Sequence, residues 1–497
     1  TSVTTKNSSD NYYTGTIATG SGSKTYIAGN VLSRDWFSVY ENNNMTKDEV
    51  KKIIFSNAEE SKALADKAGI EASDGSIPYG SKTDGYTIYM LSYMAPTIYM
   101  PIDSTELFAN FTNLTDFVTS KQTINGITYQ IPSTKYTQNM QSMFYNCSSL
   151  TNIDVSGFDT SKTTNMNYVF RGCKSLATLN LSNFSSLELK QAVGMFAECS
   201  NLKGITFGNT FTCEKVTTLS HMFWACNALE SLDLTMFNTP LLQDCENMFK
   251  ECSSVTEINF SNKFNTSNAK YFQGMFNGCS KLTGIDLSSF DTSNVLNMQE
   301  MFMGCSSLTS LNVSSFNTSR VTSMIYMFRQ CSLLTSLDLS NFSSENLLDT
   351  GGMFAESKKL QSITFGSNFT CEKVTSMTHM FWDCNALSTL DLSMFNTPVL
   401  TNTNNMFRWC NNLTSITFGN NFNTSKVTNF VGMFSACYGL KSLDLRTFVI
   451  NSGASVTDML NFGSSNKSLF NFWAPKTIGV NIVLTLGWEM YYLSNIV

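Results

Sequence analysis

The sequence is poor in charged residues and in histidine. Only 14% of its 497 residues are Asp, Glu, Lys or Arg, against about 25% in an ordinary soluble protein. The formal net charge is −6, which argues against a nucleic-acid partner, because such binding depends on clustered Lys and Arg. With two histidines in the whole chain, a His-based metal site or catalytic triad is not expected.

The sequence also lacks a recognisable anchor or targeting segment. Its most apolar late stretch, residues 478–488, is interrupted by Asn481 and is shorter than the about 20 residues that cross a bilayer. Residues 1–6 do not show the charged-then-apolar pattern of a signal peptide. Together with the abundance of Ser, Thr and Asn, this predicts a mature extracellular or cell-surface chain whose leader has been removed.

What the sequence has instead is a tandem repeat. The dipeptide Met-Phe recurs with spacings of 26 or 27 residues, with Val169 in place of one Met and Met459 in a divergent last copy. The regular copies begin at Met143, Met195, Met222, Met248, Met275, Met301, Met327, Met353, Met380, Met406 and Met433. A fixed period of this length is typical of a solenoid, in which each coil buries its apolar side against its neighbours.

Within a unit, the apolar residues have the spacing of a leucine-rich repeat. In the unit that begins at Met301, the pattern Leu-x-x-Leu-x-Leu ends in Leu311 and Val313, whose alternation predicts a short strand. The Met-Phe-x-x-Cys-x-x-Leu part spaces its apolar residues by three and four, which predicts a helical or 3₁₀ turn. The expected fold is an α/β repeat solenoid, leucine-rich-repeat-like, with about twelve turns of 26–27 residues, one short strand per turn and a cap at both ends.

Four segments are expected along the chain. They are an extended polar N-terminal tail (1–33), an α+β N-terminal capping region (34–139), the solenoid (140–460) and a C-terminal β cap (461–497). In the caps, residues 46–50 and 59–68 have the pattern of helices and residues 86–99 that of strands. Residues 478–486 and 491–497 are expected to be strands that cover the last coil.

Four units are one residue longer than the others. They begin at Met195, Met248, Met353 and Met406, and the extra residue precedes the Phe that follows the strand. A longer turn or bulge would accommodate it. Gly208, Gly366 and Gly419 lie at this place and are expected to supply a positive φ.

A larger duplication lies on top of the short repeat. Residues 212–216 recur as 370–374, and the tetrapeptide that begins at His221 recurs at His379. Both pairs lie 158 positions apart, which equals six units. The two histidines are therefore copies of one position rather than partners in one site. Because no nucleophile or acid recurs beside them at a useful spacing, we interpret them as residues at the edge of the core.

Most cysteines form a single column. Eleven of the fourteen lie four residues after the Met position: Cys147, Cys173, Cys199, Cys226, Cys252, Cys279, Cys305, Cys331, Cys384, Cys410 and Cys437. No Cys-x-x-Cys pair is present, which argues against zinc. Coils about 4.8 Å apart would allow disulfides, but a regular column is better explained by buried thiols. Cys213, Cys245 and Cys371 lie outside it and are candidates for exposed or reactive thiols.

A polar column follows the strands on their outer side. The residue between the two apolar strand positions points away from the core, and at nine units it is Asp or Asn: Asp154, Asn180, Asp233, Asn259, Asp286, Asn312, Asp338, Asp391 and Asp444. No two aspartates occupy neighbouring coils, which avoids repulsion between like charges. The column is interpreted either as charge spacing or as a face that binds carbohydrate or protein. Ca²⁺ is the one cofactor that its carboxylates would suit; otherwise no cofactor or metal is expected.

The repeat resembles a known family. Units of the form Met-Phe-x-x-Cys-Ser-x-Leu-Thr-x-Leu-Asp-Leu-Ser-x-Phe-x-Thr-Ser-x-Val-Thr-x-Met, over residues 140–460, resemble those of BspA-like leucine-rich-repeat surface proteins. Residues 101–108 and 111–114 resemble the segment that leads into those repeats. The resemblance implies a secreted or surface-attached protein of host-associated bacteria or of some protists, with an adhesive or structural role and no catalysis.

Two functions are open from the sequence. The first is adhesion or binding through an elongated repeat face, with glycans or proteins of a host or neighbouring cell as partners. The alternative is a structural subunit that self-assembles into a filament or layer through its non-repeat termini by β-augmentation. The resemblance favours the first, and the polar N-terminal and apolar C-terminal segments favour the second. No convergent set of acid, base and nucleophile is found, so an enzyme is not expected.

Overall fold

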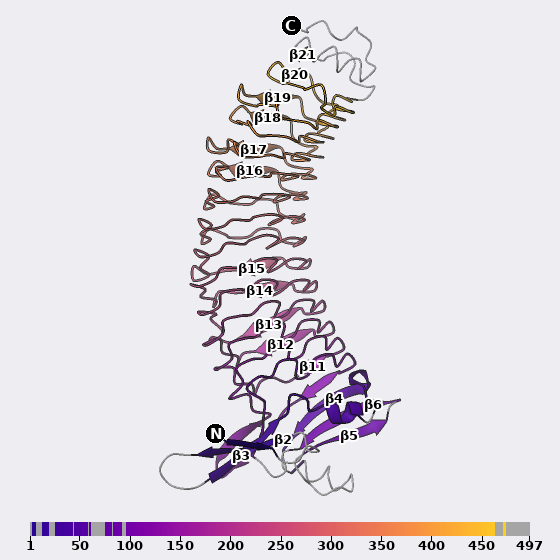
Figure 1. Ribbon diagram of the computed structural model, residues 1–497, viewed down its shortest axis with the longest axis vertical. Coiled ribbons are helices and arrows are strands. Elements are labelled where there is room, and N and C mark those ends of the chain that lie inside the picture. The colour runs from indigo at the N-terminus through magenta and orange to yellow at the C-terminus, as the bar shows by residue number, and fades with distance from the viewer. Residues whose placement is uncertain are drawn as a thin grey trace. The chain divides into compact units, whose positions relative to one another are not determined.

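A computed structural model describes most of the chain. The described residues are 2–5, 12–18, 25–42, 44–57, 59–60, 75–81, 83–91, 96–462 and 471–473. They belong to two compact units, Thr1–Leu232 with Met236–Leu241 and Asp233–Thr235 with Leu242–Val497. Within each unit, successive coils lie one above another with their strands on the same side (Figure 1).

The described N-terminal part of the first unit contains two larger sheets and a two-stranded one. One has the order β1-β2-β3-β7 and consists of β1 (Ser2–Thr5), β2 (Tyr12–Ala18), β3 (Thr25–Leu32) and β7 (Ile98–Tyr99). The other has the order β11-β8-β4-β6-β5 and consists of β4 (Val50–Ser56), β5 (Gly75–Ser81), β6 (Gly85–Leu91), β8 (Asp116–Val118) and β11 (Asn152–Ile153). The hairpin of β9 (Ser120–Ile124) and β10 (Ile127–Ile131) follows β8. The described parts of residues 1–33, expected to be an extended tail, are therefore strands.

The second of these sheets continues into the repeats. Strand β8 pairs in parallel with β11, which belongs to the first Met-Phe unit, with Asp116 opposite Asn152 and Phe117 opposite Ile153. Phe117 is fully buried and its ring packs edge-on against Phe144 of the first repeat, with centroids 4.9 Å apart. The cap thus presents the first coil with a strand and an apolar surface of the same kind as a further coil would.

The expectations for the caps have mixed outcomes. Residues 47–49 form a 3₁₀ helix, η1 (Lys47–Glu49), in which the Thr46 N–H donates to Glu49 Oε2 at 3.1 Å. The segment 86–99 contains β6 and β7, as predicted. Of the helix expected over 59–68, residues 59–60 are helical and the rest lies outside the described residues. The strands expected at 478–486 and 491–497 also lie outside them, whereas β21 (Asn471–Trp473) pairs in parallel with the last repeat strand.

The repeat strands confirm a repeat solenoid, but the expected single strand per turn is missing from the coils that begin at Met275 and Met301. They are β12 (Thr178–Leu181), β13 (Gly204–Phe207), β14 (Ser231–Asp233), β15 (Glu257–Asn259), β16 (Ser336–Leu339), β17 (Ser362–Phe365), β18 (Thr389–Leu392), β19 (Ser415–Phe418) and β20 (Ser442–Asp444). Paired strands are parallel and in step with the repeat, so Leu337 of β16 lies opposite Ile363 of β17. Each coil repeats the same side-chain type at the same height, and like residues therefore stack.

The Met-Phe side of the coils is not helical, which corrects the α/β prediction. In the described residues the helices are η1, α1 (Ser38–Asn42) and the short turn at residues 59–60. Each coil instead has two consecutive turns with positive φ at their third residue, as at Glu300 (φ 58) and Gly304 (φ 71). The Phe302 N–H donates to the Met327 carbonyl of the next coil at 2.9 Å. Positive φ and hydrogen bonds that leave the segment both exclude a right-handed helix.

The core is a set of continuous columns. Phe302 lies between Phe276 and Phe328 with ring centroids 5.5 and 5.8 Å away and interplanar angles of 12° and 2°. All three side chains are fully buried, as are Met301 and Leu308 of the middle coil. Since burial of one such ring removes a large apolar surface from water, the stacked columns account for the recurrence of Met, Phe and Leu in the sequence.

The glycines of the longer coils have a role different from the expected one. Gly208, Gly366 and Gly419 do not have positive φ. A Cβ at Gly366 would instead overlap the carbonyl oxygen of Ser340 in the preceding coil, and the same holds for Gly208 against Ser182. Glycine is required here because two backbones approach closely, which the sequence of one coil cannot show.

Replacing Gly366 by Ala is therefore expected to lower the free energy of unfolding by about 1–3 kcal/mol, because the added methyl forces two coils apart. Equilibrium urea unfolding measures the change. Gly284→Ala is the matched control, since a Cβ there meets nothing within 4 Å. Equal stability of the two variants would contradict the close-approach explanation.

Candidate functional site

The Asp and Asn column on the strand side has a local structural role. Asp286 Oδ1 accepts the Ser288 N–H at 2.9 Å, and Asn312 Oδ1 accepts the Ser314 N–H at 3.0 Å. The same bond to the residue two positions later is made by Asp154, Asn180, Asp233, Asp338, Asp391 and Asp444. These Asx turns fix the backbone that follows the column position in each of these coils.

The local bonds also affect the charge of the column. The backbone N–H of Ser288 holds the pKa of Asp286 below its ordinary value, and that of Ser340 does the same for Asp338. Asn259, in one of the longer coils, instead donates to Glu257 Oε1 at 3.0 Å. Turn capping thus explains why Asp and Asn recur in the shorter coils, and a ligand-binding role for the column stays a prediction.

The cysteines form a buried ladder of free thiols, as expected. Cys305 Sγ donates to the carbonyl of Phe276 in the preceding coil at 3.1 Å. The same bond is made by Cys147, Cys173, Cys199, Cys226, Cys279, Cys331, Cys384, Cys410 and Cys437. Where the ladder has Ser357, its hydroxyl donates to the Phe328 carbonyl at 2.8 Å. The position thus holds a small side chain with a donor, which gives the carbonyl a second hydrogen bond beside that from a backbone N–H, as from Cys279 to Phe276.

The three cysteines outside the ladder are not exposed, which corrects the sequence-based expectation. Cys213, Cys245 and Cys371 are fully buried and free. Burial raises the pKa of all three thiols. Since the thiolate is the reactive form, none of them has the properties of a reactive cysteine.

We expect none of the fourteen thiols to react readily with Ellman's reagent in the folded protein, because all are buried and burial raises, for example, the pKa of Cys331 to about 12. In about 8 M urea, which unfolds most domains, all fourteen thiols should react at the rate of free cysteine. A fast-reacting native thiol would show that a buried cysteine becomes accessible.

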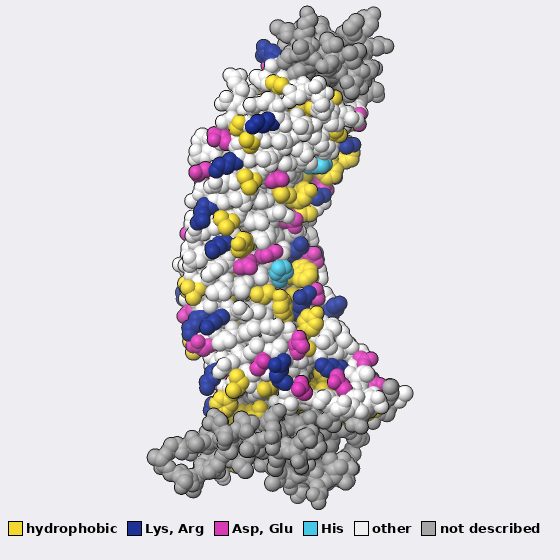
Figure 2. All heavy atoms as spheres, in the orientation of Figure 1, with side chains coloured by type: hydrophobic (Ala, Val, Ile, Leu, Met, Phe, Trp, Pro, Cys, Tyr) yellow, Lys and Arg dark blue, Asp and Glu magenta, His cyan; other side chains and the backbone are white. Residues whose placement is uncertain are grey.

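The turn side of the coils carries two copies of one polar and aromatic arrangement. The first aromatic cluster, in the first unit, is Tyr168, Arg171, Glu198, His221 and Trp224. The second aromatic cluster, in the second unit, is Tyr326, Arg329, Glu356, His379 and Trp382, each 158 positions after its counterpart. On the surface of each unit, the one histidine lies beside hydrophobic side chains (Figure 2).

In the first cluster, Arg171 is the central residue. Its Nη2 lies 3.1 Å from Glu198 Oε1, and its guanidinium carbon lies 5.5 Å from the Tyr168 ring centroid and 5.6 Å from that of Trp224. His221 packs edge-on against Trp224 with centroids 5.8 Å apart. The guanidinium is held by one carboxylate and by ring faces, an arrangement that suits arginine and not lysine.

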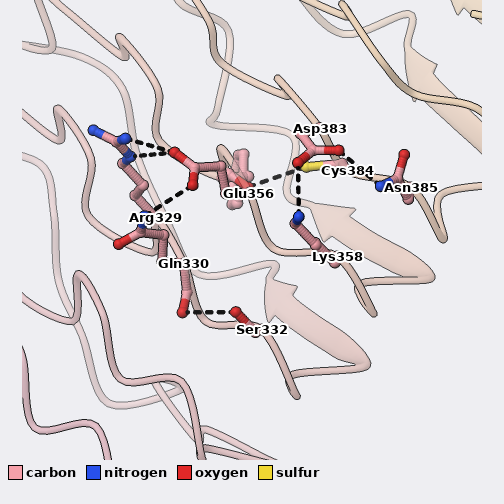
Figure 3. A network of polar contacts seen from close by, with 9 residues as sticks. Arg329, Gln330, Ser332, Glu356, Lys358, Asp383, Cys384 and Asn385 are labelled. Atoms are coloured by element: carbon pink, nitrogen blue, oxygen red, sulfur yellow. Dashed lines mark hydrogen bonds and ion pairs between the residues drawn. The ribbon is translucent and has the colours of Figure 1, made fainter.

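The second cluster repeats the ion pair, the tyrosine contact and the His–Trp contact, and it adds a bond from Gln330. Arg329 Nε donates to Glu356 Oε1 at 2.9 Å, and Gln330 Nε2 donates to Glu356 Oε2 at 2.8 Å (Figure 3). The Arg329 guanidinium carbon lies 5.0 Å from the Tyr326 ring centroid. Burial alone would raise the pKa of Glu356, but the bonds from Gln330 and Arg329 hold it below its ordinary value. His379 packs edge-on against the neighbouring indole.

Glycines with positive φ make room for the tyrosine rings. Gly194 (φ 55) and Gly352 (φ 58) precede the Met of the coil after each tyrosine. A Cβ at Gly352 would overlap the Tyr326 ring, and one at Gly194 would lie 2.6 Å from a Tyr168 ring carbon. The two glycines therefore permit both the turn and the inclined ring, so the clusters depend on the backbone of the adjacent coil.

Comparison with known families identifies the repeat. The family model described as "Mycoplasma protein of unknown function, DUF285" matches four overlapping segments, residues 107–207, 190–285, 272–390 and 361–473. These segments cover most of the chain. The chain belongs to the DUF285 family.

Other comparisons add little to this assignment. A crystal structure of a leucine-rich repeat protein from Eubacterium ventriosum is similar to the DUF285 chain at 13% sequence identity, with 61% of this chain and 78% of that chain covered and a TM-score of 0.29. A search of curated proteins finds no match. None of the helices in the described parts of the DUF285 chain has the length and hydropathy that a bilayer span requires.

The sequence singled out the histidine of each aromatic cluster, His221 and His379, but not the other residues of the clusters. The offset of 158 positions that relates His221 to His379 also relates Arg171 to Arg329 and Glu198 to Glu356. That offset was the available signal. It was not sufficient to show contact, because the paired residues come from successive coils about one repeat apart, and only the stacking brings them together.

A pH titration of His379 should show a pKa below that of an exposed histidine. Burial, and then the charges of Arg329 and Arg408, lower it. As the pH falls below the ordinary histidine pKa, His379 takes up a proton in the unfolded chain but not in the folded one. The free energy of unfolding therefore decreases in that pH range. The imidazole signals in ¹H NMR, assigned with His221→Gln, measure the pKa; a value at or above that of a free histidine would contradict the expected environment.

Proposed function

We propose that this DUF285 protein is a non-catalytic binding protein without a resident cofactor, located at the cell surface or outside the cell. It would attach to glycans or proteins of a host or neighbouring cell through the turn side of its solenoid of about twelve coils. The observation that carries the proposal is the pair of aromatic clusters. They recur only in the duplicated coils, whereas the core residues recur in nearly every coil.

The composition of the clusters supports binding. Trp, Tyr and Arg are the residues that contribute most of the free energy of binding at interfaces. Here they are held in place by an ion pair and by ring contacts, with the Arg329 and Glu356 side chains 24% and 19% exposed. Little side-chain entropy remains to be lost when such a preorganised surface meets a ligand.

The same bonds argue against catalysis at the clusters. Glu356 is the one carboxylate of the second aromatic cluster, and it accepts bonds from both Arg329 and Gln330. A general base needs a pKa close to the working pH, whereas these bonds lower the pKa of Glu356. The cluster therefore favours recognition over acid–base chemistry.

The proposal is tested with the labelled full chain on a printed array of extracellular-matrix proteins and glycans. A variant with Trp224→Ala and Trp382→Ala should lose at least about tenfold in affinity for each bound spot, as truncation of an interface hot spot does. The matched control is Asp286→Ala with Asp338→Ala on the strand side. Loss of binding in the control, with the Trp variant unchanged, would assign binding to the strand side instead.

A test of location is independent of the ligand. Antibody against the protein should label intact, unpermeabilised cells of the source organism, and protease added outside the cells should remove the signal. Labelling that requires permeabilised cells would contradict an extracellular role.

Self-assembly is a second candidate function, supported by one observation. Strand β1 lies at the edge of the sheet β1-β2-β3-β7, and an edge strand offers unpaired backbone groups to another chain. Negative-stain electron microscopy of purified protein should then show filaments that disappear on deletion of residues 1–33. Uniform separate particles from the full chain would contradict assembly.

A further inference from the structure

The second aromatic cluster continues into the next coil as a pair of stacked indoles. The rings of Trp382 and Trp409 have centroids 5.8 Å apart and an interplanar angle of 30°. Trp409 is 40% exposed, and the guanidinium carbon of Arg408 lies 5.1 Å from its ring centroid. The positions 158 residues earlier hold Lys250 and Glu251, so this extension was not part of the arrangement that both copies share.

The backbone of Trp409 indicates a role other than stability. Its φ is 66°, which is strained for a bulky residue. At the same turn position, Gly172, Gly278 and Gly304 are glycines, and the other coils have residues smaller than tryptophan, such as Ala225 and Gln330, also with positive φ. The Trp409 indole contacts Trp382 and Arg408 but does not fill the core, and its exposed part is available for a contact outside the chain.

The charges around the indole pair leave one cation without a carboxylate. Arg329 is paired with Glu356, and Lys358 Nζ lies 3.2 Å from Asp383 Oδ2 (Figure 3). In the described part of the chain, Arg408 forms no ion pair, and its Nε is buried without a hydrogen-bond partner.

The side chains that contact the Arg408 guanidinium, Asn405 and Trp409, are neutral. Its Nη1 donates to Asn405 Oδ1 at 3.4 Å, and Asn405 Nδ2 lies 3.2 Å from His379 Nε2. A guanidinium held by an amide and by a ring face keeps donors available for a planar anion.

We propose that the Trp382–Trp409 indole pair and the Arg408 guanidinium bind an acidic glycan, an oligosaccharide that carries the carboxylate of a uronic or sialic acid. The inference rests on the proposed binding function. A sugar ring has an apolar C–H face that packs on an indole, and hydroxyl groups at its edge that pair with groups such as the Asn405 amide. The carboxylate would take the place of the missing acidic partner of Arg408.

A glycan fits this surface better than a folded protein does. The apolar part consists of the exposed Trp409 ring and the partly buried Trp382 ring, with Arg408 and Asn405 beside them. A stable protein interface buries about 1,200–2,000 Å² around a continuous apolar centre. A rigid sugar of one or two rings matches the size of the indole pair, and polar side chains at its border match sugar hydroxyls.

Intrinsic tryptophan fluorescence and calorimetry of the full chain test the proposal with matched probes. The probes are 3′-sialyllactose against lactose, a hyaluronan hexasaccharide against its methyl ester, and a polyglutamate peptide. One acidic glycan should bind at least about tenfold more tightly than its neutral counterpart, and the pair that responds identifies the sugar acid. Binding should raise the pKa of His379, because a carboxylate at Arg408 offsets the positive charge nearby.

Three variants separate recognition from folding. Trp409→Gly should abolish binding while raising the melting temperature by a few degrees, since glycine suits a positive φ. Arg408→Gln should remove the preference for the acidic probe. Asp286→Ala, on the strand side, should leave binding of these probes unchanged, because Asp286 Oδ1 is engaged in a turn of its own coil.

The outcomes distinguish this inference from the proposed function. Failure of every acidic glycan to bind, equal binding of acidic and neutral probes, or unchanged binding by Trp409→Gly would overturn the acidic-glycan site. Binding of polyglutamate alone would assign the surface to an acidic peptide. If array binding still depended on Trp224 and Trp382 in any of these cases, the proposed function would stand without its acidic-glycan site.

Discussion

Phe302→Ala is expected to lower the free energy of unfolding by about 3–5 kcal/mol, as truncation of a buried aromatic ring does. The Phe302 ring is fully buried between Phe276 and Phe328. Its removal leaves a cavity between two coils and takes away the contact through which they stack. Equilibrium urea unfolding followed by circular dichroism measures the loss.

The adjacent residue provides a control for this variant. Met303 is partly exposed on the turn side, and Met303→Ala should change the free energy of unfolding by much less. Since each coil contacts only its neighbours, the Phe302 variant should also unfold over a broader urea range, with one part of the solenoid lost first. A cost similar to that of Met303→Ala would contradict the role of the stacked rings.

Thr292→Val should cost about 2–4 kcal/mol although it preserves the shape of the side chain, because two backbone groups lose their partner. Thr292 is 1% exposed. Its hydroxyl donates to the carbonyl of Asn317 in the next coil at 2.9 Å and accepts the N–H of the same residue at 2.8 Å. Chemical unfolding measures the cost.

A second threonine separates this effect from the loss of any hydroxyl. Thr322 is exposed, and its hydroxyl makes one hydrogen bond, to the Leu296 carbonyl at 3.0 Å. Thr322→Val should change the free energy of unfolding by no more than about 0.5 kcal/mol. The same pair of hydrogen bonds is made by the hydroxyls of Thr160, Thr266, Thr318 and Thr424. Equal costs for the Thr292 and Thr322 variants would contradict a general structural role for these threonines.

The spacing of apolar residues was sufficient to predict the stacking but not the path of the backbone. Intervals of three and four between Met301, Cys305 and Leu308 satisfy a helix. They equally satisfy two consecutive turns, because both place these side chains on one side. The positive φ at Glu300 and Gly304 decides between them. A glycine in the sequence suggests positive φ, whereas a glutamate does not.

The candidate site was predictable only in part for a related reason. The strand-side Asp column was visible as a pattern, yet Asp286 uses its acceptor for a turn within its own coil. The turn-side clusters have their partners in other coils, as Arg329 and Glu356 do. A pattern within one repeat shows the first kind of interaction and not the second.

The amino-acid sequence by itself determined that this chain stacks its repeats into a solenoid with buried Met, Phe, Leu and Cys columns. The reason is that one apolar pattern returns every 26 or 27 residues and can be buried only by the next copy. Only the tertiary structure decided which polar and aromatic side chains meet on the turn side. Their contacts depend on backbone φ and on the stacking of residues that lie a whole coil apart, and neither is encoded in the composition of a single repeat.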